Sequence, residues 1–368
     1  MNPGWSLGIF KRSGENFDSA CFNTMKWLPA RRFPGCRKQL VVGKVNMVVA
    51  ILCTVLMFPA WSGQAQGVDQ ATELYQHGRF QDAATILAQL SRKQSREAGL
   101  YVMLGRTYLK LRRWNDAVKE FEKAVAIEPD NGVFHLWLGR AYGRKAEHAW
   151  VFSAFGLARK ARQEFEEAVE CSPDHLDARF DLMDFYSQAP GIVGGGKDKA
   201  ENQAREIARI SPRLGYTARA ELYANEKKWE QAHAELTQAV QKFPDDSGAC
   251  ADLAGFLLER REYDGAEANA KKALALNPLG KDARLLLAAS QIALRRNLPD
   301  ALKTLQDLAA GPLTDSDPSF ENVYYRLGQA YLALERKSEA QQAFETSLGF
   351  DPEHSGAKEA LAQVKRLK

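Results

Sequence analysis

A 34-residue stretch, residues 98–131, constrains the fold more than any other part of the chain. It contains two amphipathic helical patterns separated by a turn, and a proline closes it. Small residues let two helix backbones approach closely, and larger apolar residues fill the space beside them. With Ala98 as position 1, positions 7, 8, 11, 20, 24, 27 and 32 are Leu104, Gly105, Tyr108, Ala117, Phe121, Ala124 and Pro129. The stretch therefore predicts a helical hairpin that is buried against neighbouring units.

The same pattern recurs along most of the chain, at intervals of 34 residues or of 34 plus an insertion. Insertions enlarge the third and fourth units, at about 143–160 and 188–198. The first insertion contains no proline and is rich in Ala, Arg, Lys and Glu, so we expect both helices of that unit to lengthen. We place units near 64–97, 98–131, 132–175, 176–212, 213–246, 247–281, 282–315 and 321–354, and a capping helix at 355–368.

These units resemble the tetratricopeptide repeat, and the resemblance covers roughly residues 68–354. It implies an all-α fold, namely a right-handed superhelical α-solenoid of about eight helix pairs with a C-terminal capping helix. It also implies a concave groove that binds a protein or peptide partner. The enlarged third and fourth units resemble a pair found in exported bacterial members of the family, for which no defined activity follows.

The first 66 residues follow a different pattern. Residues 1–36 show no period, so we expect a disordered leader there. Basic residues then precede an apolar segment at 45–61, and small residues follow at Gly63 and Ala65. This is the layout of a secretory signal peptide, and the segment is shorter than the ~20 apolar residues of a spanning helix. We expect a periplasmic or envelope location for the body at 67–368, with cleavage after Ala65 or, alternatively, an uncleaved anchor that tethers the body to the membrane.

Charge and residue spacing exclude several function classes. The net charge of +4 comes from the leader, where eight Lys and Arg of residues 1–65 face two acidic residues. The remainder is slightly acidic, which argues against nucleic acid as a partner. His148 follows Glu147, but no HExxH spacing occurs, and the serines and carboxylates form no nucleophile or paired-acid set. We therefore predict a non-enzyme without a metal or cofactor.

The insertion of the fourth unit contains a glycine-rich segment that almost matches a phosphate-binding loop. Asp198 replaces the required hydroxyl residue, and a helical rather than a strand pattern precedes the segment. We interpret it mainly as a turn between two helices. A small-ligand or nucleotide site here is the alternative function, and its residues would be Gly191, Gly194, Gly195, Gly196 and Lys197.

The positions that face the groove in this family define the candidate partner site. Its N-terminal part is basic and its middle is acidic or polar, so four basic residues are expected to contact an acidic or extended segment. We predict a non-catalytic scaffold or assembly factor in the bacterial cell envelope. The candidate groove residues are Arg106, Lys110, Leu136, Arg140, Arg144, Phe180, Asp184, Tyr325 and Gln329.

Overall fold

The computed structural model describes residues 67–93 and 96–366, and these residues form helices joined by turns and short loops. The expected leader and the apolar segment at 45–61 lie outside the described residues. Among the described helices, none is both long enough and apolar enough to cross a membrane.

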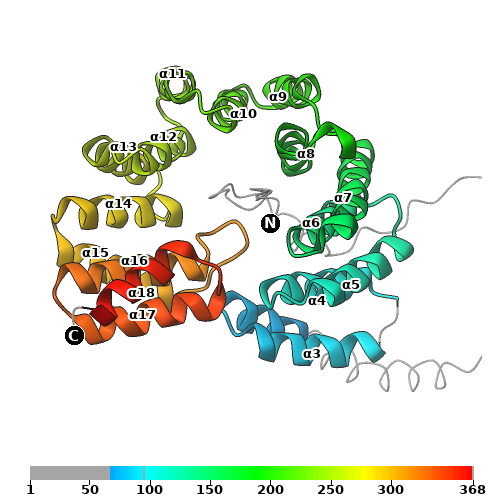
Figure 1. The fold of residues 1–368 in the computed structure, drawn as a ribbon, viewed down its shortest axis with the longest axis horizontal. Helices are drawn as coiled ribbons and strands as arrows, with labels where there is room; N and C mark the ends of the chain where they lie inside the picture. The colour runs from blue at the N-terminus through cyan, green and yellow to red at the C-terminus, as the bar shows by residue number, and fades with distance from the viewer. Residues whose placement is uncertain (1–66, 94–95, 367–368) are drawn as a thin grey trace, which may run out of the picture.

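Antiparallel helix pairs follow one another along the chain, as the repeat pattern predicts (Figure 1). A helical segment at 67–76 and α3 (Phe80–Lys93) form the first pair, and α18 (Ser355–Arg366) packs on the last. The other pairs are α4 (Ala98–Lys110) with α5 (Trp114–Ile127), α6 (Gly132–Glu147) with α7 (Val151–Cys171), α8 (Leu176–Gln188) with α9 (Lys197–Ile210), α10 (Pro212–Asn225) with α11 (Trp229–Lys242), α12 (Ser247–Glu259) with α13 (Tyr263–Leu276), α14 (Lys281–Leu294) with α15 (Leu298–Ala310), and α16 (Phe320–Ala333) with α17 (Lys337–Phe350).

Helix lengths follow the insertions. Helices α6 and α7 contain 16 and 21 residues, whereas α4 and α5 contain 13 and 14. The expected lengthening of both helices in the third unit is therefore confirmed. The fourth unit instead has a loop between α8 and α9, with a short 3-10 turn η1 (Gly191–Val193).

The alternation of small and large residues is explained by contacts inside each pair. Gly105 on α4 lies against the ring of Phe121 on α5, so a Cβ atom at Gly105 would stand 2.8 Å from that ring. Gly139 lies against Phe165 in the same way, at 2.7 Å. Because both partners belong to one 34-residue unit or its enlarged equivalent, each hairpin specifies its own packing, and stacking then buries the faces that remain.

The helix pairs curve until the first and last of them meet, so the solenoid closes into a ring (Figure 1). In the view of Figure 1, α8, α10 and α12 lie nearer the middle of the ring than α9, α11 and α13. The expectation of a stack with an open C-terminal end needs correction here, because a shared apolar cluster joins the two ends. Its buried members are Tyr75, Phe80, Ala83, Leu308, Leu313, Phe320 and Val323.

Candidate partner-binding site at the ring closure

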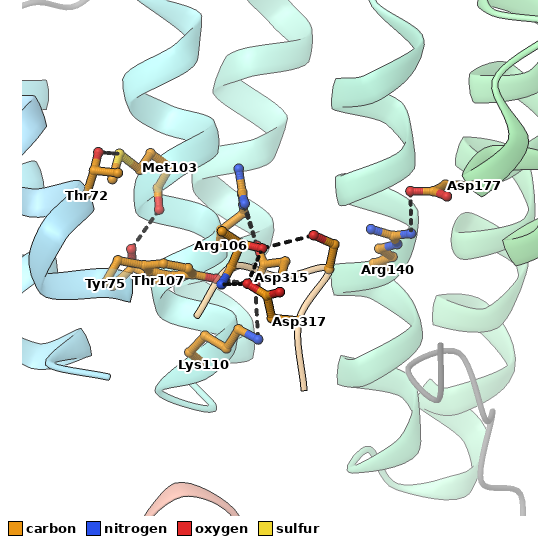
Figure 2. A network of polar contacts seen from close by, with 12 residues as sticks. Thr72, Tyr75, Met103, Arg106, Thr107, Lys110, Arg140, Asp177, Asp315 and Asp317 are labelled. Carbon is orange, nitrogen blue, oxygen red and sulfur yellow. Dashed lines mark hydrogen bonds and ion pairs between the residues drawn. The ribbon is translucent and has the colours of Figure 1, made fainter. Parts of the chain in front are cut away.

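An aspartate from the far end of the chain occupies the basic part of the expected groove. Tyr75 and Lys110 contact Oδ1 of Asp315, with Tyr75 Oη at 2.6 Å and Lys110 Nζ at 3.0 Å. Arg106 donates to Oδ2 through Nε at 2.8 Å and Nη2 at 2.5 Å. Figure 2 shows these side chains converging from the first helical segment, α4 and the loop before α16. We call Tyr75, Arg106 and Lys110 the Asp315 site.

The electrostatics of the Asp315 site favour the ionised carboxylate. Burial alone would raise the pKa of Asp315, but the charges of Lys110 and Arg106 and the hydrogen bonds from Tyr75 and Arg106 outweigh it and hold that pKa well below its ordinary value. Burial and the neighbouring carboxylate raise the pKa of Tyr75 well above its ordinary value, so its hydroxyl remains a donor. The contact is therefore a charged, hydrogen-bonded closure at neutral pH.

Aromatic packing forms a second part of the closure. The ring of Phe80 on α3 meets the rings of Phe320 and Phe350 edge-on, with centroids 6.1 and 6.0 Å away. Gly78, in the turn before α3, has a φ of +73° and lies against the same two rings. A glycine suits this turn because other residues are strained at positive φ and a side chain would meet the rings.

An ion-pair group makes the third part of the closure. Arg112, in the turn after α4, contacts Asp351 at 2.7 Å and Glu353 at 2.9 Å. His148, after α6, lies 3.2 Å from Glu353. These groups are partly exposed, so we expect them to contribute less than the more buried Asp315 contact.

A cavity of about 690 Å³ lies beside the closure, between the two ends of the chain. The first helical segment and α4 bound one side of it, and the start of α12 and residues 277–283 bound the other. Thr314, Ser316 and Asp317 add a wall from the same loop that carries Asp315. The cavity therefore combines surfaces that lie far apart in the sequence.

Asp282 lines this cavity and is under-compensated. Among the described residues, its Oδ1 is buried without a hydrogen-bond partner. Burial, followed by the charges of Asp317 and Asp252, raises the pKa of Asp282 to about 7, and the nearby Lys281 only partly offsets this. Near neutral pH the folded chain therefore holds a proton here that the unfolded chain releases.

The substitution Asp282→Asn tests this environment through its pH dependence. The raised pKa makes the folded state bind the proton more tightly, so the stability of the native chain falls as pH rises from about 4 to 7. We expect the substitution to raise the free energy of unfolding by about 1–2 kcal/mol at pH 8, after allowing for solvent screening. The difference should shrink at pH 4.5. Urea unfolding at both pH values measures it, and an equal difference at both would contradict this interpretation.

The candidate groove residues are mostly engaged within the chain. Arg106 and Lys110 lie at the Asp315 site, as described above. Leu136 and Phe180, both 2% exposed, are core residues and offer no surface to a partner. Their groove assignment is corrected, because inner helices α6 and α8 also pack against neighbouring pairs.

Arg140 continues the network of the Asp315 site into the middle of the array. The guanidinium groups of Arg106 and Arg140 both lie over the ring of Trp137, at 4.9 and 4.7 Å from its centroid. Arg140 Nε lies 2.5 Å from Asp181, and Asp177 is 4.0 Å from the same guanidinium. The basic and acidic parts of the expected groove thus neutralise each other across α6 and α8.

The remaining candidates lie apart from this network. Arg144 pairs with Glu147 on its own helix at 3.0 Å. Asp184 is partly buried on α8. On α16, Gln329 donates to the hydroxyl of Tyr325 at 2.9 Å. None of these four candidates joins the Asp315 site.

The glycine-rich loop has the geometry of a tight turn. Gly194 has a φ of +100°, and a Cβ atom at Gly195 would stand 1.7 Å from the carbonyl oxygen of Ala189. Lys197 begins α9 and contacts Glu226 of the next unit at 2.8 Å. The loop follows helix α8 and the turn at Gly191, where a phosphate-binding loop would follow a strand. The geometry favours the turn over the nucleotide site.

One group of potential metal ligands occurs within the described chain. His135, Glu167 and Cys171 each place a ligand atom within 4.8 Å of the others. Both ring nitrogens of His135 are already engaged, Nδ1 with Glu164 and Nε2 with the carbonyl oxygen of Pro129, each at 2.7 Å. A metal would have to break one of these contacts, so we assign no site here.

The sequence analysis missed the residues that face the basic groove positions. It treated the segment around Asp315 as a polar linker, and it did not single out Tyr75 or Asp282. No local signal identifies them, because Asp315 is 209 residues from Arg106 and 240 from Tyr75. Only the excess of acidic residues in that linker hinted at a charged contact.

Comparison with known proteins places the repeats in context. Models of the tetratricopeptide repeat match residues 68–131, 102–149, 223–268 and 321–354. Cellulose synthase operon protein C of Pseudomonas fluorescens is 30% identical over 138 residues, which are 36% of this chain and 11% of that protein. DnaJ protein P58IPK homolog B of Oryza sativa is 26% identical over 155 residues, which are 40% of this chain and 32% of that protein. The chain therefore matches only a minor part of these relatives.

Solved structures with similar folds are also repeat proteins of low identity. A chain of the APC/C hetero-tetramer Cut9–Hcn1 is 17% identical, with 80% of this chain and 54% of that chain covered and a TM-score of 0.43. TTC0263 of Thermus thermophilus is 20% identical, with 62% and 99% covered and a TM-score of 0.40. YrrB, described as having an unusual peptide-binding site, is 14% identical, with 65% and 96% covered and a TM-score of 0.32.

Proposed function

Because this chain is a tetratricopeptide repeat protein, we propose that it is a non-catalytic scaffold of the bacterial cell envelope that binds a segment of a partner protein inside its ring. The cavity of about 690 Å³ carries this proposal. It is bounded by helices and loops of both ends of the array, so a bound segment would contact several units at once. Its lining mixes apolar, hydroxyl and charged side chains, which suits a peptide.

The leader supports the envelope location. Its basic residues, its apolar segment at 45–61 and the small residues after it have the layout of an export signal. The body could serve a partner in the periplasm or at a membrane surface in either the cleaved or the anchored form. The identity of that partner is not needed for the test below.

Site-specific photo-crosslinking in the full-length chain tests the binding site. A photoreactive amino acid at Leu279, which lines the cavity and is 83% exposed, should form adducts with a partner in living cells. The matched control is Ile192, which is 67% exposed on the glycine-rich loop. We expect adducts from position 279 and few from position 192. Adducts from 192 alone would move the site to the loop, and none from either position would reject partner binding at both surfaces.

A further inference from the structure

The loop that joins α15 to α16, residues 311–319, lies on the first two helix pairs in the way a bound peptide would. We call it the clasp loop. Its Leu313 is buried among apolar residues of both chain ends, including Tyr75 and Phe80. Two residues later, Asp315 enters the Asp315 site.

Main-chain recognition accompanies these side-chain contacts. The amide of Leu313 donates to the carbonyl oxygen of Gln76 at 2.7 Å, across the ring closure. The first two units therefore recognise three features of the clasp loop: an apolar side chain, the amide of the same residue and a carboxylate two residues later. A segment from another protein can present the same three features.

The clasp loop also covers the cavity. Thr314, Ser316 and Asp317 line the cavity from the side of the closure. Asp317 is held separately, since its carboxylate contacts Lys281 at 2.9 Å and the amide of Thr314 at 2.7 Å. Displacement of the clasp loop would therefore widen the cavity in addition to freeing the Asp315 site.

We propose that the Asp315 site is a recognition site for extended acidic segments and that the clasp loop is its internal occupant. The preferred ligand has an apolar residue followed, two positions later, by Asp or Glu. A partner segment of this type replaces the clasp loop, pairs with Arg106 and Lys110, and opens the neighbouring cavity. This inference rests on the proposed scaffold function and names the chemical class of its partner.

The internal occupant sets the affinity that a partner needs. A tethered segment has an effective concentration on the order of millimolar, so a free peptide of equal intrinsic affinity competes poorly. The aromatic packing of Phe80 with Phe350 and the Arg112 ion pairs do not involve the clasp loop. The ring can therefore remain closed through these contacts while the loop is exchanged.

A peptide that copies the clasp loop tests the proposal with the full-length protein. The probe is a fluorescent peptide of residues 311–320, and the acceptor is the Asp315→Asn chain, whose own loop no longer supplies a carboxylate. We expect this chain to bind the peptide at least about 10-fold more tightly than the native chain, because the charged site is vacated. A peptide with Asn in place of its Asp315 should lose the gain, whereas one with Asn in place of its Asp317 should keep it. Adding Arg106→Ala to the acceptor should abolish the gain.

A second measurement needs no variant. Saturating peptide should accelerate hydrogen exchange of the Leu313 amide in the native chain, because displacement breaks its bond to Gln76. Equal affinity of both chains for the peptide together with unchanged exchange would overturn the proposal. Circular dichroism verifies that the Asp315→Asn chain is folded. The Leu279 crosslink remains an independent readout, so adducts there without peptide binding would reject only the clasp-loop inference.

Discussion

The Asp315→Ala chain is expected to lose about 3–5 kcal/mol of unfolding free energy at pH 7, the range for removing one partner of a buried ion pair. Asp315 is 12% exposed and receives contacts from Tyr75, Arg106 and Lys110. Without it, two positive charges remain close together at the closure, with no carboxylate between them. The loss comes mostly from these uncompensated charges and less from the missing contact itself. Urea unfolding followed by circular dichroism measures it.

The pH dependence of this effect is a further check. The pKa of Asp315 is depressed in the folded chain, so its contribution to stability is complete above the ordinary Asp value of about 3.9. It is lost only as pH falls through the lower folded pKa. The Asp315→Ala difference should therefore be the same at pH 5.5 and pH 8. A difference that vanishes at pH 5.5 would show that the carboxylate is not held as described.

The control for Asp315 is an exposed ion pair. Asp264, which is 75% exposed, lies 2.8 Å from Arg296. Asp264→Ala should cost no more than about 1 kcal/mol, because solvent already screens that pair. Equal losses for the two substitutions would mean that ring closure adds nothing to stability.

Closure should also change the cooperativity of unfolding. In an open array each unit contacts only its neighbours, and the end units fray first. In the ring the first and last units contact each other, so neither end is free. Hydrogen exchange in the native chain should therefore be slow in the helix at 67–76, and Asp315→Ala should accelerate it more than it accelerates exchange in α10. Uniform acceleration would indicate general destabilisation instead.

The second large effect is expected for Phe165→Ala, which should lower the unfolding free energy by about 3–5 kcal/mol. Phe165 is fully buried and its ring packs against Gly139 and Phe185. Loss of the ring leaves a cavity that the helix backbones cannot close, since the glycine already allows their closest approach. Chemical unfolding monitored by circular dichroism measures the change.

Phe152→Ala is the matched control on the same helix. Phe152 also lies on α7 but is 74% exposed. Its removal should change stability by no more than about 0.5 kcal/mol. If Phe152→Ala proved as costly as Phe165→Ala, the packing rule drawn from the small and large positions would not explain the stability of the third pair.

The groove positions illustrate how far a repeat pattern reaches. The pattern identified Arg106 and Arg140 as residues of the inner helices, and both do lie on inner helices, in contact with Trp137. It could not indicate their partners, because Asp181 belongs to the next unit and Asp315 to the far end of the chain. It also assigned Leu136 and Phe180 to the groove, although packing between successive pairs buries them. A position within one repeat does not define which neighbours cover it.

The sequence by itself determined the helix pairs and their order, because the contacts that define a pair lie within a single repeat unit. Gly105 against Phe121 is such a contact, and it depends on nothing outside its own unit. Only the tertiary structure decided the ring closure, the cavity and the occupancy of the Asp315 site. Curvature arises from a small rotation between successive pairs, and whether the ends meet depends on the sum of these rotations over the whole array. That sum brings Asp315 to Arg106, and no local pattern encodes it.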